Sequence, residues 1–303
     1  MPQNRDILWK ALIESIFDDL LRFLYPNIDQ EVNLMQPVVY IDKELAAIVP
    51  GSEEEMTTRV VDKLVKVQLR DKKFALIHVE IQGRTEEKKR HLFGSRMFCY
   101  FNLIFAKFAC PIAAIVIFTG NDGHLFPDGF SYSLMNTRVR YLYRTVNIKD
   151  YSEEELAASS NPFAWVLLIA KLALLRGKDR EKRWLEGKLF VLQKLYGTGQ
   201  LEDRKLQAVL VFMERYLPLE DAEIRRQFSK HVDQLTNKKN TMDMIELDRQ
   251  LTREESEKAA RESVVRELLI HSRFSDKRIA AITKISSRKV AKMRKQIRSK
   301  KPA

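Results

Sequence analysis

The chain has 303 residues, of which 45% are hydrophobic and 31% are charged, so it can bury a sizeable core and is not intrinsically disordered. Its two cysteines exclude a disulfide framework and a cysteine-based metal site, and its apolar runs are too short to span a membrane. We therefore expect a cytoplasmic protein with no membrane partner.

The positive charge is concentrated at one end of the chain. The formal net charge is +12, and residues 271–303 hold twelve Lys or Arg and one acid, a net of +11. Residues 1–270 therefore have a net charge of +12 − 11 = +1. A basic cluster of this kind indicates an anionic partner, and nucleic acid is the leading candidate.

The N-terminal part predicts a helix followed by a β-hairpin. Residues 4–25 have apolar side chains at helical spacing, and residues 38–41 predict a short strand. From residue 59 to residue 82 the period changes to two, with apolar residues at odd positions and polar residues at even positions on both sides of a polar turn. This pattern predicts an antiparallel hairpin with one buried and one polar face.

Further elements follow the hairpin. We expect a long helix over residues 86–108, a buried central strand over 112–118, and a second strand pair from 130–134 and 138–148. Helices are then expected over residues 152–158, 163–176, 180–196, 201–216 and 220–235. The predicted fold is α/β, with a mixed sheet flanked by helices in residues 1–150, a helical region in 151–240, and a charged helix with a basic helical hairpin in 241–303.

The basic tail shows amphipathic spacing. Ser275 can cap a helix with Ile279 and Ile282 turned inward, and Ser286 or Ser287 can cap a second helix with Val290, Met293 and Ile297 turned inward. The outer positions are the basic residues Arg288, Lys289, Lys292 and Lys295, which we expect to contact DNA phosphates. This hairpin resembles the helical pair of a helix-turn-helix, without its turn glycine. The alternative is a solvated cationic extension.

Three polar residues of the predicted hairpin share one face. A loop of residues 71–73 sets Asp62 opposite Gln82, and a loop of residues 70–72 sets it opposite Glu80. Two carboxylates so close repel unless a positive charge lies between them. Mg²⁺ meets this requirement, because it prefers carboxylate and carbonyl oxygens, and the carbonyl of Ile81 can add a ligand. The alternative is a solvated sheet face with surface ion pairs.

At these residues the chain resembles a known group of nucleases. The resemblance rests on Asp62, on His78-Val-Glu-Ile-Gln82 and on Arg96-Met-Phe-Cys-Tyr100, and it extends to Trp9-Lys10, Asp42-Lys-Glu44 and Asn161-Pro-Phe163. The group is the PD-(D/E)XK nuclease superfamily, and more closely its recombination-promoting nuclease family of transposase-like proteins. The resemblance implies a restriction-endonuclease-like fold and a Mg²⁺-dependent (alternatively Mn²⁺-dependent) DNA endonuclease that is linked to recombination or transposition.

The resemblance also implies residue roles. Asp62 and Glu80 correspond to the metal ligands, Glu44 to an assisting acidic residue, and Gln82 to the position that is Lys in the superfamily at large. Arg96 and Tyr100, four residues apart on a helix, share a face that can approach a phosphate beside the metal, or make a polar contact with the sheet. Lys66 can neutralise phosphate, while Asp42 or Glu31 can replace Glu44.

One feature, the neutral Gln82, keeps an alternative function in consideration. Gln82 is neutral and cannot supply the point charge of a lysine, so we expect slow cleavage or dependence on a second metal ion. The alternative is a catalytically silent nucleic-acid-binding or interaction module on the same fold, and an RNase is a third candidate. The sequence does not fix the oligomeric state, and a homodimer is compatible with it.

We predict that deletion of residues 271–303 weakens retention of DNA on a native gel, because these residues supply most of the positive charge. The loss should be largest at low salt, where release of counterions from DNA contributes most to binding. Gel retention over a salt series measures the effect, and a circular dichroism spectrum checks that the shortened chain folds. Equal retention of both chains at low salt would contradict the prediction.

Overall fold

The computed structural model describes residues 2–42, 63–83, 90–197 and 201–236, and in the C-terminal part residues 263–265, 267–270, 274–283, 290 and 293–294. The chain divides into two compact units, residues 1–237 and residues 238–303. The boundary predicted at residue 150 lies inside the first unit, between β7 (Arg144–Asn147) and α7 (Glu153–Ala158).

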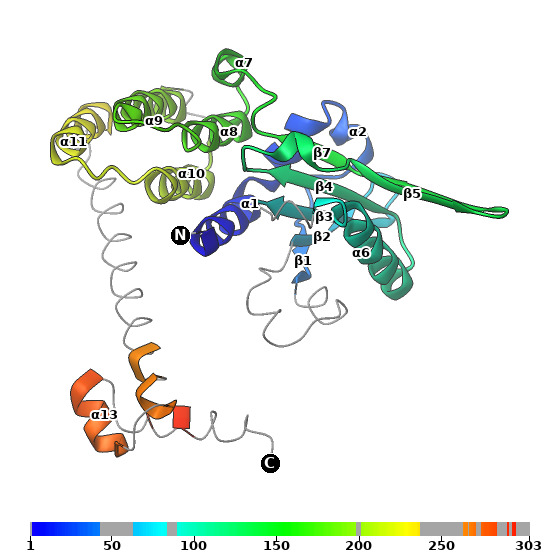
Figure 1. The fold of residues 1–303 in the computed structure, drawn as a ribbon. Helices are drawn as coiled ribbons and strands as arrows, with labels where there is room; N and C mark the ends of the chain where they lie inside the picture. The colour runs from blue at the N-terminus through cyan, green and yellow to red at the C-terminus, as the bar shows by residue number, and fades with distance from the viewer. Residues whose placement is uncertain are drawn as a thin grey trace. The chain divides into compact units, whose positions relative to one another are not determined.

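A five-stranded mixed sheet lies at the centre of the first unit (Figure 1). Its other strands are β1 (Val39–Tyr40), β2 (Lys63–Gln68), β3 (Phe74–Gln82) and β4 (Ile112–Phe118), and the order is β1-β2-β3-β4-β7. β2 pairs antiparallel with β1 and β3, whereas β4 pairs parallel with β3 and β7. The predicted mixed α/β fold and the central strand at residues 112–118 are confirmed.

Helices cover both faces of the sheet. α6 (Phe93–Phe108) packs on one face and forms a buried, largely aromatic cluster with β4. α1 (Pro2–Leu24) and α2 (Ile28–Glu31) lie on the other face (Figure 1). The polar face predicted for the hairpin is therefore buried under α6 and is not the solvated sheet face of the alternative, since His78 is only 1% exposed and Glu80 only 6% exposed.

β2 and β3 form the predicted hairpin, with Lys63 opposite Val79. The backbone N–H of Leu69 donates to the carbonyl of Lys73 at 2.8 Å, so the loop consists of residues 70–72. Lys72 has a φ of 67°, the left-handed conformation that usually ends a three-residue hairpin loop. This is the register for which the sequence sets Asp62 opposite Glu80, although Asp62 lies outside the described residues.

Residues 138–148 do not form one strand. β6 (Thr137–Leu142) pairs with β5 (Gly129–Leu134) in a separate two-stranded ribbon, and β7 joins the central sheet beside β4. The alternating pattern shifts at the junction, because the apolar residues occupy odd positions up to Tyr143 and even positions at Val146 and Ile148. Tyr143 marks it, because this side chain is buried against the ring of Phe93 while its backbone N–H donates to the carbonyl of Asp128.

A group of helices completes the first unit. After α7 come α8 (Pro162–Leu172), α9 (Arg180–Gly197), α10 (Asp203–Tyr216) and α11 (Ala222–Thr236). α8 and α10 pack against α1, where Trp9 is fully buried and its ring lies 5.1 Å, edge-on, from the ring of Phe212. Of the helices that the structure describes, none has the length and apolar character needed to cross a membrane.

The described part of the second unit includes α13 (Asp276–Thr283) and a small buried cluster. The cluster consists of Val265, Ile279, Val290 and Met293. Ile282 is 54% exposed, so its predicted inward position is wrong. Thr283 takes the inward place instead, four residues after Ile279, and its hydroxyl donates to the carbonyl of Ile279 at 2.8 Å.

Candidate functional site

One guanidinium joins two polar residues of β3. Nη2 of Arg96, on α6, donates to Oε1 of Glu80 and to Oε1 of Gln82, both at 2.9 Å. Glu80 and Gln82 are two residues apart and therefore point to the same face of the strand, the face that α6 covers. The structure thus brings together three residues that the sequence predicts for the site.

The electrostatics of this group are those of a half-buried ion pair, in which the carboxylate is the buried partner. The side chain of Glu80 is 8% exposed, and that of Arg96 is 36% exposed. A carboxylate removed from water needs a compensating positive charge, and the guanidinium supplies it. The face of the guanidinium also lies 4.8 Å from the ring centre of Phe93, which holds Arg96 over the strand.

His78 lies beside the ion pair, although sequence analysis quotes it within the resemblance and assigns it no role. Its ring is buried on the same face as Glu80 and meets the ring of Tyr100 edge-on, with 5.8 Å between the ring centres. Burial lowers the pKa of His78 to about 4, Glu80 opposes this shift, and Arg96 and Lys10 add to it. His78 is therefore neutral near pH 7. The sequence does contain a signal for this position: His78 stands between two apolar residues and, two residues before Glu80, points to the same face of the strand.

The site lies at the carboxyl end of β3, next to the carboxyl end of β4. The carbonyl of Gln82 accepts from the N–H of Thr119, which directly follows β4, at 2.9 Å. In the loop after β4, Asp122 accepts from Nη2 of Arg90 at 2.7 Å. Sequence analysis missed this second ion pair, although residues that follow parallel strands are common ligand contacts.

The remaining predicted residues within the described range occupy three different places. Tyr100 is buried one helical turn from Arg96, against His78. Ile81 is half-buried between Glu80 and Gln82 in sequence, so its side chain points to the opposite face. Lys66 pairs with Leu76, about 13 Å along the strand from Glu80, and its ammonium lies 4.1 Å from the ring centre of Phe74. Lys66 is not brought to the ion pair.

Several predicted residues cannot be placed. Asp62, Glu44, Arg288, Lys289, Lys292 and Lys295 lie outside the described residues. Of the alternatives to Glu44, Asp42 accepts from Nζ of Lys63 at 2.6 Å and from the N–H of Leu64 at 2.9 Å, so β2 uses both of its carboxylate oxygens.

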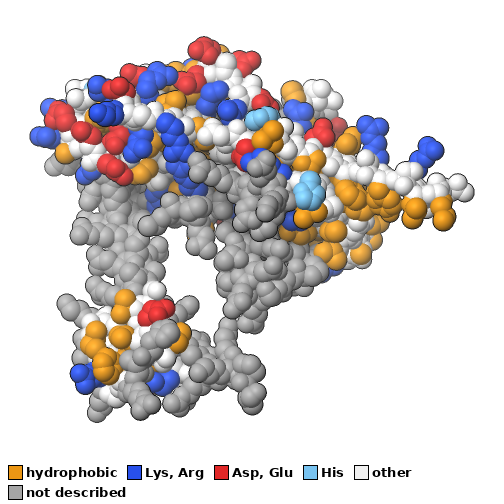
Figure 2. All heavy atoms as spheres, viewed as in Figure 1, with side chains coloured by type: hydrophobic (Ala, Val, Ile, Leu, Met, Phe, Trp, Pro, Cys, Tyr) orange, Lys and Arg blue, Asp and Glu red, His pale blue; other side chains and the backbone are white. Residues whose placement is uncertain are grey.

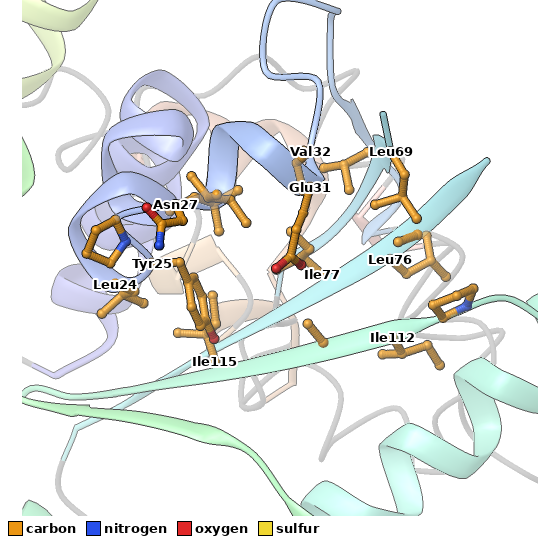
Figure 3. A pocket seen from close by; sticks show the side chains of 17 residues that line it. Leu24, Tyr25, Asn27, Glu31, Val32, Leu69, Leu76, Ile77, Ile112 and Ile115 are labelled. Atoms are coloured by element: carbon orange, nitrogen blue, oxygen red, sulfur yellow. The ribbon is translucent and has the colours of Figure 1, made fainter. Parts of the chain in front are cut away.

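A cavity of about 550 Å³ lies on the opposite side of the sheet from Glu80 (Figure 3). Ile77 and Ile115 line it from β3 and β4, and in Figure 3 the carboxylate of Glu31 and the ring of Tyr25 point into it from α2 and the end of α1. Because Ile77 has the opposite parity to Glu80, the cavity is separate from the ion pair. Glu31 therefore cannot replace Glu44 beside Glu80.

Among the described residues, the site offers two oxygen ligands for a hard cation, which is only part of the coordination shell that such an ion needs. Within the described ranges, no group of three His, Cys, Asp or Glu side chains could hold a metal ion. A carboxylate oxygen of Glu80 and the amide oxygen of Gln82 nevertheless converge on one positively charged nitrogen. Oxygen donors of this kind are the ligands that Mg²⁺ and Mn²⁺ take, whereas softer metals prefer sulfur and imidazole.

Comparison with known proteins adds no relative. No family model matches the chain, and no match was found among curated proteins or solved structures. Membership of a nuclease family therefore stays an expectation from the residues quoted above.

We predict that Arg96→Met lowers the free energy of unfolding by about 1–3 kcal/mol, because it leaves the buried carboxylate of Glu80 without its counter-charge. Glu80→Gln in the same chain should recover part of this loss, since a neutral amide needs no counter-charge. Chemical denaturation of the single and double variants gives the coupling energy. Arg183→Met, which removes an exposed ion pair with Glu153, is the control and should cost less than about 1 kcal/mol. Strictly additive losses would refute the coupling.

We predict that His78 makes the protein less stable in mild acid. The unfolded chain takes up this proton near pH 6.5, whereas the folded chain does so only near its pKa of about 4. Stability is therefore full above about pH 6.5 and falls by up to about 3 kcal/mol as the pH drops towards 4. The free energy of unfolding, measured near pH 7 and near pH 4.5, gives this loss. The loss should be smaller in His78→Leu. It should be unchanged in the control variant His231→Leu, because His231 is exposed. An unchanged pH dependence in His78→Leu would disprove it.

Proposed function

We propose that this chain is a Mg²⁺-dependent DNA endonuclease of the PD-(D/E)XK type, with a restriction-endonuclease-like fold, acting in recombination or transposition. The observation that supports it most is the convergence of Glu80 and Gln82 on Arg96 at the carboxyl end of β3. These are three of the residues on which the resemblance to that superfamily rests.

The register of the hairpin also supports the proposal. Lys63 is opposite Val79, so an antiparallel pairing continued by one residue would set Asp62 opposite Glu80. The proposal requires this continuation, because the second carboxylate of the site is Asp62. With this continuation, the site has the two carboxylates, Asp62 and Glu80, that a nuclease of this type uses.

The proposed site assigns a role to each residue. Asp62, Glu80 and the carbonyl of Ile81 would hold Mg²⁺, or Mn²⁺ in its place, with Glu44 assisting. Such an ion, when bound, polarises a phosphoryl oxygen and lowers the pKa of water. The amide of Gln82 orients the attacking water by hydrogen bonding, and Arg96 donates to a phosphate oxygen of the DNA. The ring of Tyr100 and the neutral ring of His78 pack against each other beside these residues.

The second candidate is a catalytically silent module of the same fold that binds nucleic acid or another protein. Two observations favour it. Gln82 lacks the charge of the superfamily lysine. Arg96 already neutralises Glu80, which is the electrostatic role that a metal ion would otherwise fill.

Plasmid nicking separates the two candidates. We predict slow nicking of supercoiled plasmid with Mg²⁺, none with EDTA, and a loss of at least about a hundredfold in Asp62→Ala and in Glu80→Ala, because each variant removes a proposed metal ligand. Glu154→Gln, at an exposed position of α7, is the control and should nick at the wild-type rate. A parallel assay on RNA distinguishes an RNase.

Three results would count against the enzyme. Nicking that persists in both alanine variants would indicate a contaminating nuclease, and nicking in EDTA would exclude the proposed metal. DNA retention on a gel without any nicking would favour the silent module.

A further inference from the structure

The β5–β6 ribbon projects from the first unit as a narrow arm (Figure 1). Its base is fixed to α6 by aromatic contacts. The ring of Phe98 stacks on that of Phe130 with 5.1 Å between the centres, and the ring of Phe101 lies 5.0 Å from that of Tyr141. Beyond this base, among the residues that the structure describes, the two strands pair with each other and with no further strand.

The ribbon has two chemically different faces. Ser131 pairs with Arg140, and Ser133 pairs with Arg138, so these four residues share one face, which we call the Ser/Arg face. The other face is apolar, and at the base it is the face that packs on α6. The Ser/Arg face therefore points away from α6 and is exposed.

The Ser/Arg face is positively charged without local compensation. The sequence contains no acidic residue between Asp128 and Asp150, and within the described residues Arg138 and Arg140 form no ion pair. In Figure 2, Lys and Arg side chains stand on one side of the projecting arm and hydrophobic side chains line the other. A projecting basic surface of this kind attracts an anionic partner.

The shape of the arm favours duplex DNA as that partner. The major groove of B-DNA admits a two-stranded β-ribbon. A second copy of the chain does not fit the same face, because two-fold pairing of identical Ser/Arg faces would bring four arginines together. At the tip, outside the Ser/Arg face, Leu134 is 66% exposed and Met135 is 91% exposed.

We propose that the Ser/Arg face of the β5–β6 ribbon binds the backbone of duplex DNA. Arg138 and Arg140 contact phosphate oxygens, and the hydroxyls of Ser131 and Ser133 donate hydrogen bonds to neighbouring phosphates. The inference rests on the proposed function, since it assigns to this arm the holding of the same DNA substrate. The packing of the ribbon on α6 joins the arm to the helix that carries Arg96.

The test is equilibrium binding of the full chain to a short fluorescent DNA duplex in EDTA, where no metal-dependent cleavage occurs. The double variant Arg138→Ser/Arg140→Ser should raise the Kd about tenfold or more near 0.1 M salt. It should also make the plot of log K against log salt shallower by about 1.8, because each phosphate contact contributes about 0.9 to the slope.

Two further variants control for charge and folding. Arg176→Ser/Lys178→Ser removes the same charge from exposed positions between α8 and α9, and it should bind nearly as the wild type does. Arg138→Lys/Arg140→Lys keeps the charge and should keep the salt dependence. The single variants Arg138→Ser and Arg140→Ser, each expected to make the salt slope shallower by about 0.9, test the inference even if the double serine variant does not fold.

The outcomes separate this inference from the proposed function. Unchanged Kd and salt slope in Arg138→Ser/Arg140→Ser overturn the inference, whether or not the wild type nicks plasmid. If binding depends on the arginines but the wild type does not nick plasmid, the inference is supported and the proposed endonuclease activity is overturned. If Leu134→Ser/Met135→Ser converts a dimer into a monomer while the arginine variant binds normally, the arm pairs with a second copy, and the inference is overturned.

Discussion

The carboxylate of Glu80, placed under α6, is the constraint on which the described site depends. A charge in that position must be met by a cation, and Arg96 meets it from the helix above. The same nitrogen holds Gln82, so one guanidinium fixes two side chains of β3 and the distance between strand and helix. The polar group is therefore part of the packing between α6 and the sheet as well as a candidate site.

The surroundings of this ion pair explain its position. β3 lies between an antiparallel neighbour and a parallel one, and helices cover both faces, so its carboxyl end is where polar groups can reach solvent. The loop after β4 adds the Arg90–Asp122 pair at this end. α6 joins these features to the β5–β6 ribbon, which it supports through Phe98 and Phe101.

Much of the fold could be predicted from local patterns, and the errors have physical causes. The hairpin and β4 follow from period two and from an unbroken apolar run, and the parity of Glu80 and Gln82 correctly puts them on one face. The alternation of polar and apolar residues does not show, however, that the polar face is buried. This face is covered by α6, which packs on it from elsewhere in the chain. The division of residues 138–148 is marked in the sequence by a change of the apolar positions from odd to even after Tyr143, but the pairing of the two pieces with different sheets depends on tertiary contacts.

The packing of α1 has a consequence for how the protein is made. This helix is synthesised about two hundred residues before α10, yet Trp9 needs Phe212 of α10 to complete its surroundings. Nearly the whole first unit must therefore be synthesised before its N-terminal helix can reach its native contacts. During translation the apolar side of α1 stays open to water or to chaperones, and a ribosome that stalls before α10 would release a chain prone to aggregation.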